Sequence, residues 1–218
     1  MNLSDFSHVI FDLDGVLLDT EKLYTQATQE VVGEYGKTFD WTLKVQMMGR
    51  HELEGANLLV QALDLPISAE EYLRRQAPLM DRLFLTAAEV PGAEQFVSVL
   101  AQRGHALAVG TSSIRRLYDL KTAHHPWFSA FSAVVSGDHP EVRELKPAPD
   151  IFLAAARAIA GEPARCLVVE DSPAGVLAAR AAGMSVVAIP DPALSDDRFG
   201  HAHLIVRSYA ELRLHFNC

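Results

Sequence analysis

The 218-residue sequence contains little cysteine, no excess of basic residues and no long apolar run. Its two cysteines, Cys166 and Cys218, are too few for a disulfide framework and lack metal-site spacing. Lys and Arg number 19 against 28 Asp and Glu, which argues against nucleic acid or an anionic membrane as the main partner. No apolar run could span a bilayer, and residues 1–7 lack the features of a secretory signal. We therefore expect a cytoplasmic protein, and nothing points to an obligate protein partner.

Short apolar runs alternate with helical stretches over most of the chain. A hydrophobic fraction of 49% and a charged fraction of 22% are typical of a protein with a sizeable core. This alternation predicts a doubly wound α/β fold with a parallel, Rossmann-like sheet. The predicted strands are residues 9–11, 106–109, 134–135, 167–169, 186–189 and 204–206.

The stretch between residues 20 and 90 contains no strand-like run. Helical periodicity predicts helices over residues 21–35, 53–63 and 68–86, and Ser68 and Glu71 have the spacing of a capping box. We expect residues 1–18 and 90–218 to form the α/β core and residues 19–89 to form an α-helical cap inserted after the first strand. The insert could be a plain stabilising subdomain, but its place directly after an acidic loop favours a lid.

That acidic loop contains Asp12, Asp14 and Gly15, directly after the apolar residues 9–11. In an open parallel sheet, ligands bind at the carboxyl ends of the strands. Two carboxylates placed there repel each other unless a cation or a shared proton relieves them, and divalent hard cations prefer carboxylate oxygens. The pattern alone would fit a solvated acidic turn equally well, so its interpretation depends on the other strand ends.

Three further polar groups follow predicted strands or turns. Thr111-Ser112-Ser113 could bind an anion at a helix start, or could be an ordinary helix cap. Glu170 and Asp171 supply two more carboxylates, although Asp171 could instead cap the next helix. Lys146 places a cation at a proline-rich turn. Carboxylates for a metal, donors for an oxyanion and a lysine together favour phosphoryl transfer, which depends mainly on positioning and charge stabilisation.

In this order the motifs resemble those of the haloacid dehalogenase (HAD) superfamily across nearly the whole chain: DLDGVLLDT, TSS, KPAPD and EDSPAG. The resemblance implies an Mg²⁺-dependent phosphomonoester hydrolase that forms an aspartyl-phosphate. It makes Asp12 the nucleophile and Asp14 the general acid and base. It assigns the phosphoryl oxygens to Thr111, Lys146 and the Ser112 backbone N–H. It assigns Mg²⁺ to Asp171, the Asp12 carboxylate and the Asp14 carbonyl, with Glu170 in support.

Within the superfamily, DTEKLY, SGDHPEV, KPAPDIFLAAA and DLKTAHH resemble the pseudouridine-5′-phosphatase branch, and β-phosphoglucomutase shares KPAPDIF and the cap. The mutase has a histidine in place of Tyr24, and an arginine where this chain has Glu52, which would repel a second phosphate. A phosphatase acting on a small phosphorylated metabolite, nucleotide-like or a sugar phosphate, is therefore favoured over a mutase or a non-catalytic metabolite-binding protein. The resemblance also predicts that the cap contacts substrate through Tyr24 and Arg50, together with Glu21, Met47, Met48 and Gly49.

Overall fold

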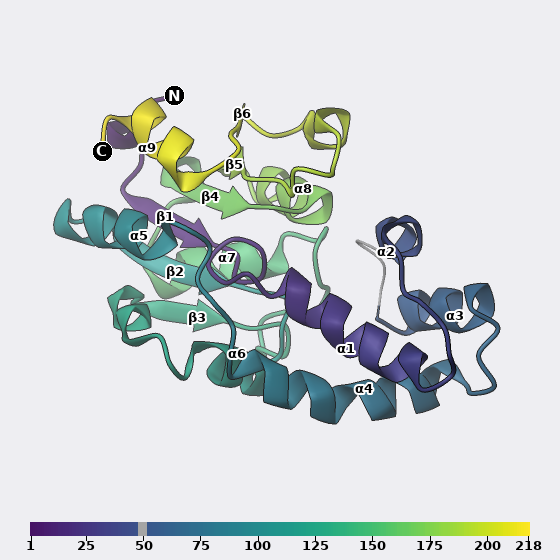
Figure 1. Cartoon of the computed structure of the whole chain (residues 1–218). Coiled ribbons are helices and arrows are strands. Elements are labelled where there is room, and N and C mark those ends of the chain that lie inside the picture. The colour runs from purple at the N-terminus through teal and green to yellow at the C-terminus, as the bar shows by residue number, and fades with distance from the viewer. Residues whose placement is uncertain (48–51) are drawn as a thin grey trace. The chain divides into compact units, whose positions relative to one another are not determined.

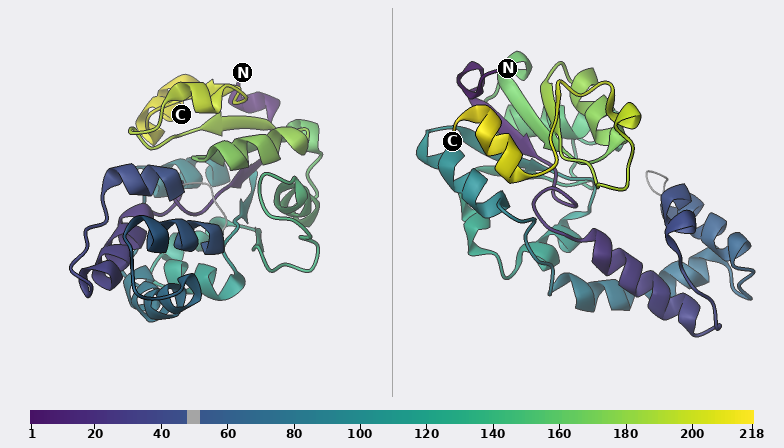
Figure 2. Two further views of the ribbon diagram at one scale, coloured as in Figure 1. Left: turned by 90° about the vertical axis from the view of Figure 1, so that its right-hand side faces the viewer. Right: turned by 45° about the horizontal axis from the view of Figure 1, so that its top comes forward.

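The computed structural model describes residues 1–47 and 52–218, which form two compact units. The core unit comprises Met1–Asp19 and Ala88–Cys218, and the cap unit comprises Thr20–Ala87. The chain leaves the core unit after its first strand and returns to it once, so the cap unit is an insertion (Figure 1). The two termini lie near each other on the core unit (Figure 2).

The core unit is built on a parallel sheet in which β1 is central. The strand order is β3-β2-β1-β4-β5-β6, and β1 pairs with both β2 and β4. Because the order of the strands reverses at β1, its carboxyl end is the topological switch point where such sheets bind ligands. The strands are β1 His8–Phe11, β2 Ala106–Gly110, β3 Ala133–Val135, β4 Cys166–Glu170, β5 Ser185–Ala188 and β6 Leu204–Ile205.

Helices cover both faces of this sheet (Figure 1). Helix α7 packs against β2 and β3, α8 packs against β5, and α5 contacts α9. The helices are α5 Ala93–Gln102, α6 Arg115–Thr122, α7 Asp150–Ala158, α8 Pro173–Ala181 and α9 Tyr209–Phe216, and the short 3₁₀ helices are η1 Leu3–Asp5, η2 Pro126–Ala130, η3 Pro163–Arg165 and η4 Asp196–Phe199. The predicted doubly wound α/β fold is confirmed.

The cap unit is helical and has its own hydrophobic core, formed around Val31, Val32, Leu59 and Tyr72. Its helices are α1 Glu21–Gly33, α2 Trp41–Met47, α3 Glu52–Ala62 and α4 Ala69–Phe84. Ser68 caps α4 by accepting the backbone N–H of Glu71, as the S-x-x-E spacing predicts.

Helix α2 was not predicted from the sequence. Its seven residues are too few to show a clear helical period. The sequence feature that marks its start is Asp40, whose Oδ1 accepts the N–H of Leu43 at 2.9 Å in the manner of an N-cap. None of the helices in the described ranges is long and apolar enough to cross a membrane. The predicted substrate contacts Met48, Gly49 and Arg50 lie outside the described residues.

Candidate active site

The loop after β1 carries the two predicted catalytic carboxylates and folds back tightly on the core unit. The N–H of Asp12 continues the sheet pairing by donating to Val169 O at 3.0 Å. Gly15 then turns the chain with a φ of +75°, and its N–H donates to Leu18 O at 2.8 Å. A Cβ at Gly15 would lie 2.0 Å from Asp171 Oδ2, so glycine also leaves room for that carboxylate. The loop after β1 thus packs closely against Asp171, at the end of β4.

Lys146 draws together the ends of three strands. Its Nζ donates to Asp12 Oδ1 at 2.6 Å, to Glu170 Oε1 at 2.8 Å and to Gly110 O at 3.0 Å. Burial acts to lower the pKa of Lys146, but the carboxylates of Asp12 and Glu170 outweigh it and hold that pKa above its ordinary value. Lys146 is therefore an ammonium placed beside the predicted nucleophile.

Glu170 is fully buried and organises the start of α8. Its Oε2 accepts the N–H groups of Asp171 and Ser172, each at 2.8 Å, and the Ser172 hydroxyl at 3.0 Å. Gly175 makes room for this carboxylate, since a Cβ there would lie 1.7 Å from Glu170 Oε1. The side-chain cap of α8 is Ser172, which accepts the Gly175 N–H, and not Asp171 as the sequence also allowed.

Three carboxylates meet at the carboxyl ends of β1 and β4. Asp12, Glu170 and Asp171 each offer an oxygen, and these oxygens lie within 4.8 Å of one another. Burial, with the nearby charges of Glu170 and Asp14, outweighs the Lys146 ammonium and raises the pKa of Asp12 to about 7. A divalent cation would relieve this crowded negative charge, so the donor set fits Mg²⁺. Both Glu170 oxygens already accept protein donors, so Glu170 suits a supporting role better than direct ligation of the metal.

The Thr111-Ser112-Ser113 run follows β2 and closes on itself. Thr111 is buried, its N–H donates to Val135 O at 3.0 Å, and its Oγ1 accepts the Ser113 N–H at 3.1 Å. The ordinary Ser/Thr cap considered above does not form: the N-cap of α6 is Ile114, and Asp138 Oδ1 accepts the Arg115 N–H. The Thr111 hydroxyl therefore makes its contact within the loop after β2, and the run does not cap α6.

Asp14 has two partners that sequence reasoning missed. Lys121 Nζ donates to Asp14 Oδ1 at 2.6 Å and to Oδ2 at 2.9 Å, and the Ser113 hydroxyl donates to Oδ2 at 2.9 Å. The DLKTAHH stretch carried a family resemblance but no role for its lysine. A lysine in a short helix with a strongly polar sequence is usually solvated, whereas this one is buried.

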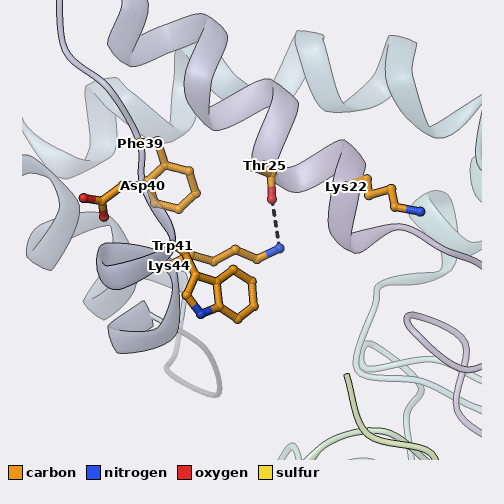
Figure 3. Close-up of a pocket in the computed structure, with 6 residues that line it drawn as sticks. All are labelled: Lys22, Thr25, Phe39, Asp40, Trp41 and Lys44. Carbon is orange, nitrogen blue, oxygen red and sulfur yellow. Dashed lines mark hydrogen bonds between the residues drawn. The ribbon is translucent and has the colours of Figure 1, made fainter. Parts of the chain in front are cut away.

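The cap residues predicted to contact substrate are described by the structure only in part. The Tyr24 ring meets Phe84 edge to face with centroids 5.4 Å apart. A pocket of about 390 Å³ also lies in the cap unit, where Lys44 Nζ reaches Thr25 Oγ1 at 2.9 Å and stands 5.5 Å from the centre of the Trp41 ring (Figure 3). The pocket is lined by Lys22, Thr25, Phe39, Asp40, Trp41 and Lys44. The substrate contacts of Tyr24 and Arg50 remain predictions.

Comparison with known proteins agrees with the fold and the motifs. Residues 6–183 match the family model described as haloacid dehalogenase-like hydrolase. The chain is 42% identical to (DL)-glycerol-3-phosphatase 2 of Arabidopsis thaliana, over 95% of this chain and 89% of the relative. It is 43% identical to the “Probable pseudouridine-5'-phosphatase” of Drosophila melanogaster, over 97% and 93%. A “putative beta-phosphoglucomutase” structure from Thermotoga maritima superposes with a TM-score of 0.82 at 30% identity, over 97% and 99%.

The chain therefore belongs to the haloacid dehalogenase-like hydrolase family. Within it, the predicted likeness to the pseudouridine-5′-phosphatase and β-phosphoglucomutase branch is confirmed, and so is the prediction of a phosphatase of this superfamily.

Proposed function

We propose that this phosphatase is an Mg²⁺-dependent phosphomonoester hydrolase that forms an aspartyl-phosphate on Asp12. The observation that carries the proposal is the Lys146 ammonium, held 2.6 Å from Asp12 Oδ1 and 2.8 Å from Glu170 Oε1 at the switch point of the sheet. A cation placed there lies where the negative charge of a phosphoryl group would develop, in surroundings that exclude most water.

The proposed reaction has two steps, in which Asp12 and Asp14 carry out the bond changes. A carboxylate oxygen of Asp12 attacks phosphorus, the ester P–O bond breaks, and Asp14 gives its proton to the leaving oxygen. Water then attacks the same phosphorus and gives a proton to Asp14, and the bond between phosphorus and Asp12 breaks. Lys146, Thr111 and the Ser112 N–H hold the phosphoryl oxygens during both steps. Mg²⁺ bound by Asp12 and Asp171, with the Asp14 carbonyl, would supply further neutralisation of their charge.

We propose a small phosphorylated metabolite as the substrate. Support comes from the names of the relatives, which specify glycerol 3-phosphate and pseudouridine 5′-phosphate. The groups at the sheet edge would serve any phosphomonoester, so selectivity among these candidates is assigned to the cap unit, with Tyr24 and Arg50 as polar contacts to the leaving group. A pocket built to hydrogen-bond a hydroxyl or amide discriminates strongly against substrates that lack it.

Release of inorganic phosphate from a panel of such esters tests the proposal, with Asp12→Asn as the decisive variant. This change removes the attacking anion and nearly conserves the side-chain volume, so turnover should fall to background while the fold survives. Asp64→Asn is the matched control, because Asp64 is exposed, lies in the cap unit and has a φ of +49° that asparagine also adopts. Substantial turnover by a folded Asp12→Asn variant would refute the covalent mechanism.

The alternatives give different results in the same assay. A phosphomutase would move the phosphoryl group to a second hydroxyl of a sugar phosphate without net release of phosphate. A non-catalytic metabolite-binding protein would bind the ester and leave it intact. The structural likeness to a mutase keeps the first alternative open to test, while Glu52, exposed at the start of α3, favours hydrolysis.

A further inference from the structure

Lys121 is a buried cation in the core unit that the proposed reaction has not used. Its side chain has no exposed surface, although it stands near the end of the eight-residue helix α6. Burying an ammonium is costly unless opposite charge and hydrogen bonds compensate it. Asp14, 107 residues earlier in the chain, provides that compensation through both of its carboxylate oxygens.

The contacts form a closed triangle with consistent donors and acceptors. Lys121 Nζ donates to both Asp14 oxygens and to Ser113 Oγ at 2.8 Å, and the Ser113 hydroxyl donates its own proton to Asp14 Oδ2. Ser113 is itself fixed, because its N–H donates to Thr111 Oγ1 and its carbonyl accepts the Gly137 N–H. These contacts hold both oxygens of the ionised Asp14; when one oxygen carries the proton to be transferred, the other can still accept from Lys121.

We infer that Lys121, acting with Ser113, is a positioning residue that sets the orientation in which Asp14 transfers protons. The inference rests on the proposed function, in which Asp14 gives a proton to the leaving oxygen and later takes one from water. A carboxylate on a loop can rotate about its side-chain torsions. In the other rotamers its oxygen would not point at the leaving oxygen or at the attacking water. Because a misplacement of about 1 Å can cost roughly 100-fold in rate, fixing this side chain matters to both steps.

The test compares two esters that differ in their need for an acid. An alkyl phosphate such as glycerol 3-phosphate has a poor leaving group that must be protonated, whereas p-nitrophenolate leaves without a proton. The ratio kcat/KM reports on steps up to leaving-group release. Lys121→Met, which keeps the length and removes the charge, should lower kcat/KM for the alkyl ester on the order of 10- to 100-fold and for the aryl ester much less. Ser113→Ala should act in the same direction with a smaller effect.

A double-mutant cycle separates positioning from a general structural role. If Lys121 acts through Asp14, adding Lys121→Met to Asp14→Asn should change the residual hydrolysis of the aryl ester by less than about 3-fold. Lys121→Arg keeps the charge and should retain more alkyl-ester activity than Lys121→Met does. Thermal unfolding of each variant checks that the protein is folded under the conditions of the kinetic assay. If Lys121→Met does not fold, the comparison of the two esters is made with Ser113→Ala instead.

Three outcomes would overturn the inference: an equal loss of kcat/KM for both esters, a full additive loss in the Asp14→Asn background, or wild-type kinetics with only a lowered Tm. Failure of the proposed function looks different. In that case the wild-type protein would release no phosphate from either ester, or Asp12→Asn would retain turnover, whatever the Lys121 variants do.

Discussion

Gly175→Ala should disable the site although Gly175 takes no part in the proposed chemistry. A Cβ at this position would lie 1.7 Å from Glu170 Oε1 and 1.9 Å from its Cδ, so Oε1 must retreat by roughly 1.3 Å merely to reach 3.0 Å. The displaced carboxylate would give up the N–H groups of Asp171 and Ser172 and its contact with Lys146.

The size of the effect follows from the burial of this carboxylate. Glu170 has no exposed surface, and disrupting a buried ion pair costs about 3–5 kcal/mol. Typical unfolding free energies are roughly 5–15 kcal/mol, so a loss of this size is a large fraction of the stability and should clearly lower the urea midpoint. Since Lys146 would lose one of its two carboxylate partners, a shift of about 1 Å in its position should lower kcat/KM on the order of 100-fold.

Urea unfolding and phosphate release measure the two effects on the same sample. Gly200→Ala is the matched control: Gly200 is exposed, its φ is −58°, and an added Cβ would come no closer than 3.7 Å to Asp197 O. This control should keep full activity and be unchanged or up to about 1 kcal/mol more stable. A Gly175→Ala protein with stability within 1 kcal/mol of wild type and full turnover would refute the placement of Glu170 beneath Lys146.

Three further changes test other parts of the molecule. Chelation should abolish turnover, Mg²⁺ should restore it, and Ca²⁺ should inhibit, because the looser shell of Ca²⁺ misplaces nucleophile and phosphate; full activity after thorough chelation would count against the metal site. Tyr72→Phe should destabilise the cap unit by about 1–2 kcal/mol in thermal unfolding, since the buried hydroxyl contacts Thr28 Oγ1 and Gln76 Nε2. Burial raises the pKa of Tyr72 to about 12, so between about pH 10 and 12 the phenol ionises in the unfolded chain and stays neutral in the folded protein; the wild type should lose stability over this range as the pH rises, and the Phe variant should not show this part of the loss. Arg50→Ala should lower kcat/KM for the true substrate far more than for a generic aryl phosphate, and equal losses would remove Arg50 from the selectivity residues.

Local sequence patterns were sufficient for most of the fold. The six strands were predicted because strands buried on both faces form short apolar runs, and α1, α3 and α4 of the cap unit were predicted from their helical period. Ser68 marked the start of α4 through its spacing to Glu71. The residues at the strand ends were also readable, since parallel strands of one sheet must present their carboxyl ends together. Because Asp12, Thr111 and Asp171 each follow a predicted strand, the sequence already implied that they lie at the same edge of the sheet.

Only the tertiary structure decided which partner each charged group has. Glu170 stood next to Asp171 in the sequence as one of two candidate ligands, yet its oxygens are occupied by Lys146 and by the start of α8. Lys121 carried no local signal, because its partner Asp14 lies 107 residues away. Sequence periodicity records which face of a helix is buried, but the pairing of buried charges depends on how separate elements pack, and that information is absent from any single segment.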